Sequence, residues 1–491
     1  MKEYLYYAAL ALLLFSKGIG LYDGTTLFKI FLVPALGCLV LKIVMTTYQR
    51  AEYALIAVLL VIGGSSYLIS GEKGMLIYIL LILGMKSVPI KRIFTVGLVA
   101  WGIAFVGLTA SSLLHLYDTP FKVHDKLGLG HMFRWGLGYV HPNVLHVSFL
   151  ILLFFIMSVF HERFNWKWCL VMFAANCYIF LYSVSYAGFG MVCIYLILHM
   201  YWTYRKKIGK IEKIFIFFVF PGCALLSLAG PFLLKGKAYV IVDKILNHRL
   251  SLAENFLKPE NISLFGVRTS NIVTHNLTMD NAYVFAFITY GCVFFLCIFA
   301  IYELLLYKLV KFNKGTEIAM VITILGYGLV EPFLFNTSIK NLSIFFIGAY
   351  FWGELNWEST EGTQFSTKMI RGWKKFIDAF RKKRQKIIVI SVLAGCVCCI
   401  SYFKLVSVPE AYMVQRVECE METKDFKTFP KDYAEKHPEV RVIDYVDENT
   451  FMEVFSGSIV KIELLRGGVS SFLLGAAGIG ILSMVLQIRK G

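Results

Sequence analysis

Uncharged apolar runs separated by short basic connections recur along the chain and constrain its fold more than any other feature. A helix of about 20 apolar residues crosses the roughly 30 Å of hydrocarbon in a bilayer. Twelve runs that reach or approach this length lie at 4–16, 28–46, 53–70, 74–86, 93–115, 143–160, 168–184, 187–203, 214–234, 282–306, 317–335 and 341–355, and two more at 387–405 and 468–488. The pattern predicts an all-α polytopic membrane protein with a twelve-span core and a two-span C-terminal appendix.

The composition excludes an ordinary soluble protein. Of the 491 residues, 58% are hydrophobic and only 16% are charged, whereas soluble chains carry about a quarter charged residues. The formal net charge is +17, but the positive residues lie in the connections between apolar runs, as membrane orientation signals do. We therefore expect membrane lipids around the chain and no nucleic acid as a partner.

Lys and Arg in the short connections predict the orientation, because such residues stay on the cytoplasmic side. If the spans alternate, one side holds the tract 357–386, with nine Lys or Arg against three acids, and the basic connections 86–92, 161–167, 205–213 and 307–315. We expect this side, and both termini, to be cytoplasmic. The opposite side is then exported and holds the long loops 116–142, 235–281 and 406–466.

The predicted domains follow from this topology. Residues 1–355 form the twelve-span core, 356–386 a basic cytoplasmic linker and 387–491 the appendix. The exported segment 406–466 of the appendix is acidic, with 13 Asp or Glu against 8 Lys or Arg.

Motifs for metals and cofactors are absent from the sequence. Ten of the eleven cysteines fall inside predicted spans, and no HExxH or CxxC spacing accompanies the histidines around the first exported loop, His115, His124, His131 and His141. No Walker loop, GxSxG elbow or dinucleotide fingerprint occurs. We expect neither a metal ion nor a cofactor.

Polar residues gather instead near the exported ends of the spans. The first long loop contains GHMFRWGLGYVHPNVLH, with Arg134, His141 and Asn143, and Pro142 fits a helix start. Anchoring at headgroups by Arg134 and helix capping by Asn143 explain these residues as well as a functional site does.

The second long loop contains NHRLSLAENFLKPENISLFGVRTSNIVTHNLTMDN, which includes Arg249, Arg268, His275 and Asp280. Its apolar residues Leu250, Leu252, Phe256, Leu257 and Leu264 follow a roughly helical spacing. We expect the loop to fold back on the membrane surface and to hold its arginines in fixed places.

A set of short motifs, taken in order, resembles the O-antigen and capsular polysaccharide polymerase family (Wzy-type) and, more distantly, the O-antigen ligases. The motifs are "HPN" at the start of a span, "NHRLSLAENFL…ISLFG" in the outer loop, "DNAYVFAFITYG" at the start of the next span and "LVEPFLFN" in the one after. The resemblance covers about residues 90–355, and no single motif is specific.

The resemblance implies a glycosyltransferase of the bacterial cytoplasmic membrane. Such enzymes polymerise oligosaccharide repeat units, linked to polyprenyl pyrophosphate, into surface polysaccharide on the outer face, without a nucleotide sugar. It implies these lipid-linked oligosaccharides as substrates, and a flippase and a chain-length regulator as protein partners.

The chemistry of this reaction suggests a role for each candidate residue. A departing pyrophosphate needs cations, and arginine suits phosphate because its fork binds two oxygens. Arg249, which matches the family's "R-L-S" arginine, is the first candidate for this role, Arg268 the second and Arg134 the third. The attacking hydroxyl must lose a proton, to Asp280 or His275. Substrate-binding roles are assigned to His141, Asn143, Asn281 and Glu331, although Asn281 or Asp280 also fits a helix cap and Glu331, beside Pro332, also fits a structural role.

Two departures from the family pattern leave alternatives open. Where ligases carry a His-Asn pair ten residues before a glycine, this chain has Asp280-Asn281 before Gly291, and His275-Asn276 lies five residues earlier. Tyr186 stands where many relatives have an arginine. One alternative is that the protein transfers the glycan to another acceptor, as the ligases do, because that reaction uses the same lipid-linked donor. A lipid-linked oligosaccharide flippase or transporter would also have 12 to 14 spans, but we would expect charges at mid-depth in several spans and internal repeats.

The appendix has its own faint resemblance. Its start, "KK…IIVI…YFKLVSVPEAY", resembles the first span of chain-length regulators, which flank an outer domain with two spans. A fused regulator and an appendix without separate activity are both open.

Overall fold

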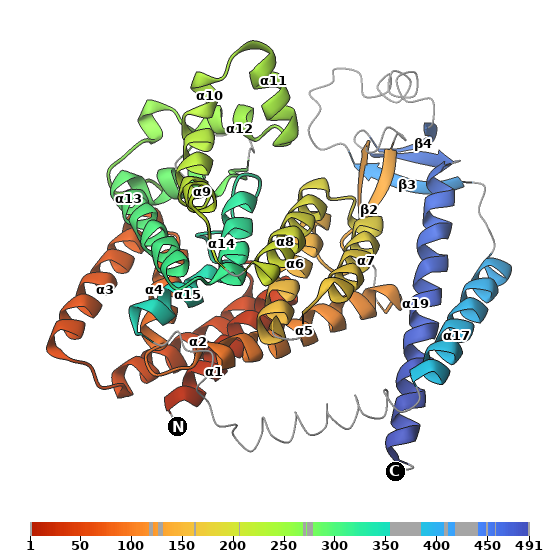
Figure 1. Ribbon diagram of the computed structural model, residues 1–491. Helices are drawn as coiled ribbons and strands as arrows, with labels where there is room; N and C mark the ends of the chain where they lie inside the picture. The colour runs from red at the N-terminus through yellow and green to blue at the C-terminus, as the bar shows by residue number, and fades with distance from the viewer. Residues whose placement is uncertain are drawn as a thin grey trace. The chain divides into compact units, whose positions relative to one another are not determined.

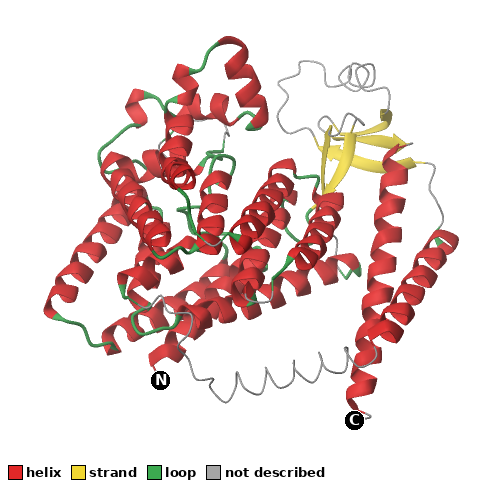
Figure 2. Cartoon of the chain, viewed as in Figure 1, coloured by secondary structure: helices red, strands yellow, loops and turns green. Residues whose placement is uncertain are grey.

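The computed structural model of the chain describes residues 2–116, 121–125, 131–161, 164–205, 207–268, 272, 278–353, 384–406, 411–417, 440–447, 450–456 and 458–489. The described chain is mostly helical, and its strands are confined to two small sheets (Figure 2). It divides into two compact units, the first of residues 1–112 and 137–359 and the second of 113–136 and 360–491. The sequence suggested no boundary around residues 113–136.

The first unit is built from helices and their connections. In chain order they are α1 (Lys2–Gly18), α2 (Thr26–Met45), α3 (Arg50–Ser70), α4 (Gly74–Gly84), α5 (Ile90–Leu113), α6 (Pro142–Val159), α7 (Trp166–Ser183), α8 (Tyr186–Tyr204), α9 (Lys210–Leu228), α10 (Gly230–Leu233), α11 (Gly236–Ile245), α12 (Arg249–Phe256), the 3₁₀ turn η2 (Pro259–Asn261), α13 (Ala282–Lys311), α14 (Gly315–Tyr327) and α15 (Ser343–Phe351).

The second unit combines two helices with two antiparallel sheets. Strand β1 (Phe121–Asp125) pairs with β2 (His131–Trp135), and the other sheet has the order β3 (Ala411–Val417), β5 (Thr450–Ser456), β4 (Val440–Asp447). Helices α17 (Arg384–Leu405) and α19 (Ser458–Arg489) pack side by side (Figure 1). Glycines such as Gly395 and Gly475 lie at this contact, where a side chain would meet the facing helix, as in close packing between membrane helices.

The structure confirms a helical, multi-pass membrane protein by the length and composition of its helices. Nine helices among the described residues are long and apolar enough to cross a membrane, namely α2, α3, α5, α6, α8, α9, α13, α17 and α19. The apolar helices α4 and α14 are shorter. The strands were not expected: they lie within 116–142 and 406–466, the loops predicted to be exported, whose short alternating segments give no long apolar signal.

Two predicted spans are shorter as helices than as apolar runs. The run 317–335 becomes α14, which ends at Tyr327, and the run 341–355 becomes α15, which begins at Ser343. Pro332 explains the interruption, because proline lacks the amide N–H and disfavours helical backbone in the residue before it. Residues 328–342 therefore connect α14 and α15 without regular helix.

Helix α13 is interrupted at Gly291, whose backbone has φ 83° and ψ 172°. The outer-loop residues Ser263 and Leu264 fit into this interruption: the amides of Cys292 and Val293 donate to their carbonyl oxygens at 3.0 and 3.1 Å. Gly266 has a positive φ of 91°, and a Cβ on either glycine would overlap the backbone of the facing segment. The "LFG" and "TYG" motifs are thus the two halves of one backbone contact.

The outer-loop helix α12 packs on the first turns of α13. Its residues Ala253 and Phe256 are buried with Val284 and Ile288 of α13. The helical spacing of apolar residues in this loop is confirmed, and it fixes α12 against α13 beside α10 and α11 (Figure 1).

Candidate functional site

The connection 328–342 is the centre of a polar cluster in the first unit. Donors from α12 and α13 bind its carbonyl oxygens: the Ala282 amide to Gly328 at 2.8 Å, Asn281 Nδ2 to Leu329 at 3.1 Å, Arg249 Nε to Val330 at 3.2 Å and the Tyr290 hydroxyl to Phe335 at 2.5 Å. Buried carbonyls without partners are costly. These donors explain how a non-helical segment is accommodated among packed helices.

Asn281 caps α13. Its Oδ1 accepts from the amides of Tyr283 and Val284 at 2.9 and 3.1 Å, and its Nδ2 donates to Ser227 Oγ at 2.9 Å as well as to Leu329. The side chain is 4% exposed. An amide group offers two acceptor and two donor positions, so these four bonds use its capacity and explain Asn281 as a helix cap. The predicted substrate contact of Asn281 stays a prediction.

Capping by Asn281 leaves the Asp280 carboxylate to pair with Arg249. The Arg249 Nη2 to Asp280 Oδ2 distance is 3.2 Å, with the arginine side chain 11% exposed and the aspartate 30% exposed. Arg249 also donates from Nη1 to the Asn247 carbonyl at 3.4 Å. Within the part of the chain that the structure describes, Arg249 is the only hydrogen-bond or ion-pair partner of Asp280. The other carboxylate oxygen, Oδ1, has no such partner among the described residues.

Asp243, which the sequence analysis did not single out, fixes the start of the helix that carries Arg249. Its Oδ1 accepts from the amides of Leu250 and Ser251 at 3.0 and 3.1 Å, and its Oδ2 lies 3.1 Å from His248 Nδ1. Burial alone would raise the pKa of Asp243, but hydrogen bonds from Ser251 and His248 bring it below its ordinary value. Asn247 and His248 have positive φ values of 53° and 63°, so the corner before Arg249 depends on these bonds.

Glu331 brings the start of α6 into the cluster. Asn143 Nδ2 donates to Glu331 Oε1 at 3.3 Å. His141 precedes it as the N-cap of α6, with Nδ1 accepting from the Asn143 amide at 3.1 Å. Asn143 and Glu331, which lie 188 positions apart in the sequence, thus meet at the segment that Arg249 also binds, and His141 is held next to Asn143.

Lys340 is a further cation in this segment that the sequence analysis missed. It is partly buried, and among the described residues no hydrogen-bond or ion-pair partner approaches its ammonium group. Burial lowers the pKa of Lys340, whereas the negative charge of Glu331 opposes this shift. The preceding Ile339 has a φ of 54°, a strained conformation for a β-branched residue. The signal available in the sequence was a lysine next to a predicted span end.

Arg268 lies in the first unit but binds elsewhere. Its Nε and Nη2 donate to the carbonyls of Ile69 and Leu68 at 3.3 and 3.2 Å, at the end of α3. A cation is favourable at a helix C-terminus. These two hydrogen bonds attach the loop that carries Arg268 to the end of α3, and they account for the arginine without any contact to a substrate.

Arg134 and His275 are not part of the described cluster. Arg134 lies in β2 of the second unit, opposite Lys122 of β1, and is 6% exposed. His275 falls outside the described residues, so its role stays a prediction. Tyr186, which replaces the arginine of many relatives, is 47% exposed at the first position of α8.

The cluster combines the Asp280 carboxylate, the Arg249 guanidinium and the Lys340 ammonium group within a few segments of the first unit. This set can bind an oxyanion and accept a proton. Among the described residues no group of three or more His, Cys, Asp or Glu side chains is placed to hold a metal ion. Comparison with known proteins adds no relative: neither a family model, nor a curated protein, nor a solved structure matches the chain.

Proposed function

We propose that the protein is a membrane glycosyltransferase that polymerises polyprenyl-pyrophosphate-linked repeat units on the outer face of the cytoplasmic membrane. In this proposal the chain crosses the membrane with twelve core spans and two further spans, and both termini are cytoplasmic. The flippase that delivers the units and a chain-length regulator are its expected partners.

The observation that carries the proposal is the Arg249–Asp280 pair beside Glu331 and Lys340. Arg249 Nη2 and Asp280 Oδ2 are 3.2 Å apart, and the two residues come from two of the motifs that carry the family resemblance. Lys340 adds a second cation whose charge interacts with Glu331. A site that moves a sugar from a pyrophosphate needs cations for the leaving group and a proton acceptor for the nucleophile.

The ion pair suggests an order of events. An arriving pyrophosphate competes with Asp280 for Arg249, because both anions suit the guanidinium fork. Release from Arg249 frees the Asp280 carboxylate to accept a hydrogen bond from the attacking hydroxyl. The acceptor hydroxyl oxygen then bonds to the anomeric carbon, its proton passes to Asp280, and the bond to the pyrophosphate oxygen breaks so that the polyprenyl pyrophosphate leaves with that electron pair.

The test compares surface glycan length among variants that insert normally. Arg249→Ala, Asp280→Ala and the nearly isosteric Asp280→Asn should each reduce the glycan to single repeat units. The first removes a cation that stabilises the leaving group, and loss of a general base in the other two costs about 100-fold or more in rate. The matched control is Glu260→Ala, an exposed acid in η2 of the same loop, which should keep long chains. Normal chain length in all three site variants would overturn the assignment.

A lipid-linked oligosaccharide flippase is the second candidate, and one observation favours it. Helix α13 is broken at Gly291, and a non-helical connection with Glu331 and Lys340 joins the short helices α14 and α15. Broken helices with charged residues occur at the binding sites of transporters. Deletion of the protein separates the candidates: single lipid-linked units accumulate on the outer face if it is a polymerase and on the inner face if it is a flippase.

A further inference from the structure

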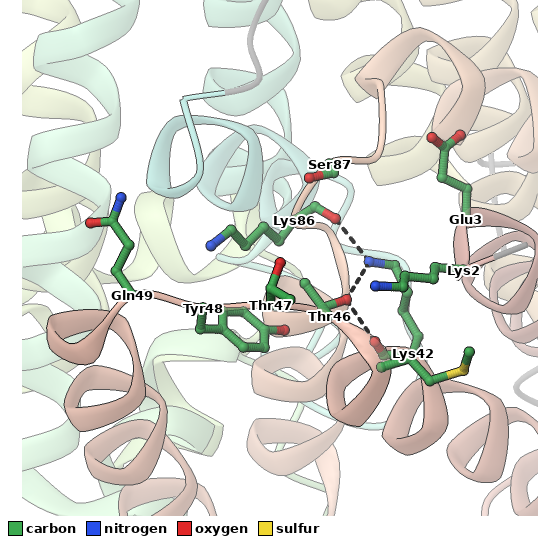
Figure 3. Close-up of a pocket in the computed structure, with 10 residues that line it drawn as sticks. Lys2, Glu3, Lys42, Thr46, Thr47, Tyr48, Gln49, Lys86 and Ser87 are labelled. Atoms are coloured by element: carbon green, nitrogen blue, oxygen red, sulfur yellow. Dashed lines mark hydrogen bonds between the residues drawn. The ribbon is translucent and has the colours of Figure 1, made fainter.

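A cavity in the first unit lies among the predicted cytoplasmic ends of its helices. Its volume is about 820 Å³, within the range of about 300–1,000 Å³ common for ligand pockets. Three segments line it: the start of α1 with Lys2 and Glu3, the end of α2 with the turn 45–49, and the connection after α4 with Lys86 and Ser87 (Figure 3). No residue of the Arg249 cluster lines it.

The wall of this cavity contains a buried cation. Lys42 is 1% exposed, and its ammonium group donates to Thr46 Oγ1 at 2.8 Å and to the Lys86 carbonyl at 2.9 Å (Figure 3). Removing a lysine from water costs several kcal/mol unless other interactions offset it. Its place in the last turn of α2 offsets part of that cost, because cations stabilise helix C-termini.

The surroundings of Lys42 are also basic and rich in hydrogen-bond donors. Lys86 forms an ion pair with Glu52, and Glu3 is bound by Arg92 at 3.0 Å. Both carboxylates are thus paired. The cavity lining itself holds three lysines and one acid: Lys2, Lys42 and Lys86 against Glu3. The side chains of Thr47, Gln49 and Ser87 add donors to the lining. This excess of positive charge favours an anion as the occupant.

The flanks of the cavity indicate which kind of anion. Val40, Leu41 and Val44, in the last two turns of α2, are 49%, 48% and 75% exposed on sides of the helix that turn away from Lys42, and such apolar surface suits lipid acyl chains. Anionic headgroups are enriched in the cytoplasmic leaflet, and basic pockets between helices on that side bind them. We propose that this cavity binds the phosphate headgroup of an anionic phospholipid, with the acyl chains along α2.

The experiment uses the full chain in detergent and does not depend on the proposed transferase activity. Phosphatidylglycerol and phosphatidylcholine with identical acyl chains are titrated, and retained lipid is measured by native mass spectrometry alongside the melting temperature. We expect retention and a higher melting temperature with phosphatidylglycerol only. Lys42→Gln and Lys2→Gln should each weaken this binding about fivefold, since one lysine contributes about 1 kcal/mol to binding an anionic lipid.

Two comparisons make the outcome decisive. Lys29→Gln removes an exposed lysine at the other end of α2, and this control should bind phosphatidylglycerol normally. Because Lys2 is also exposed, Lys2→Gln should fold even if Lys42→Gln does not. Equal retention of both lipids, or unchanged binding in Lys2→Gln and in folded Lys42→Gln, would overturn the proposal. Inorganic phosphate alone, if it gave the same stabilisation and displaced the lipid at millimolar concentration, would identify a free anion as the occupant and overturn the lipid assignment.

Discussion

At the scale of single residues, the cluster depends on how Arg249 is held. The side chain binds Asp280, Val330 and Asn247, so the guanidinium is oriented before any ligand arrives. Asp243 sets the backbone from which it extends, through the amides of Leu250 and Ser251. Such positioning groups act through geometry, and a small displacement of a catalytic group can lower the rate strongly.

Asp243→Ala should therefore lower the activity by displacing Arg249, although Asp243 itself is not proposed to touch the substrate. Loss of a carboxylate at a helix start costs about 1–2 kcal/mol of local stability, so we expect faster hydrogen exchange of α12 amides and a drop of about tenfold in glycan polymerisation, equivalent to about 1.4 kcal/mol of transition-state stabilisation. The matched control is Glu260→Ala, an exposed acid in η2, which follows α12. Unchanged exchange in Asp243→Ala would contradict the positioning role.

The same contact predicts a pH dependence for α12. The pKa of Asp243 is lowered in the folded protein, so its contribution to stability is fully present above the ordinary aspartate pKa of about 3.9 and is lost as pH falls through the lower, folded-state value. Protection of the α12 amides relative to Asp243→Ala should be constant between about pH 5 and 8 and should disappear only in stronger acid.

At the scale of elements, the interruptions of the helices organise the site. The break in α13 receives the outer-loop segment around Gly266, and the gap between α14 and α15 supplies the carbonyls that Arg249 and Asn281 bind. An unbroken α13 or α14 would satisfy these backbone groups internally and leave no place for the loop. The "LFG" and "TYG" motifs are explained by this contact without any reference to catalysis.

Gly266→Ala and Gly291→Ala test this contact. Both positions have positive φ, and the added methyl group would overlap backbone atoms of the facing segment. We expect each variant to lose about 3 kcal/mol or more, because strain and steric overlap add, and therefore to melt at a clearly lower temperature or to give little folded protein. Gly107→Ala in α5, where a Cβ meets nothing within 4 Å, should fold normally. Wild-type melting temperatures for both site variants would refute the paired-glycine contact.

At the scale of the whole molecule, contacts between connections follow the predicted alternation of spans. Glu3 pairs with Arg92, and the Ile208 amide with Asn313, among segments expected in the cytoplasm. Asp23 pairs with Lys73 among segments expected on the exported side. These contacts separate two sets of helix ends, while the assignment of one set to the cytoplasm depends on the positive-inside rule.

Reporter fusions test that assignment. Alkaline phosphatase, which folds only outside the cytoplasm, should be active when fused after Glu260 and inactive when fused after Gly209, because α9 lies between the two positions. A cytoplasmic reporter such as β-galactosidase should give the reverse pattern. Activity of the phosphatase at Gly209 would invert the topology and place the Lys42 cavity on the exported side.

Several features could be predicted from the sequence because they are local. Asn281 as a helix cap, the helical outer loop and the helix start at Pro142 follow from residue type and spacing over a few positions. The early end of α14, the role of Asp243 and the strands of the second unit were not predicted. The role of Asp243 and the strands depend on partners in other segments, which hydropathy and capping patterns do not describe. The end of α14 has a local cause in Pro332, but the apolar run continues past it and hydropathy alone does not mark the break.

The sequence by itself determined that this is a helical protein of the membrane, because hydrocarbon offers backbone groups no partner and only long apolar helices satisfy them within one segment. The tertiary structure decided which polar residues meet. Arg249 and Val330 are 81 positions apart, and Asn143 and Glu331 are 188 apart; such pairs form only when packing of α6, α12, α13 and α14 brings them together, and the sequence order does not specify that packing. Packing geometry therefore places Asp280 next to Arg249, whereas Arg268 binds the carbonyl oxygens at the end of α3.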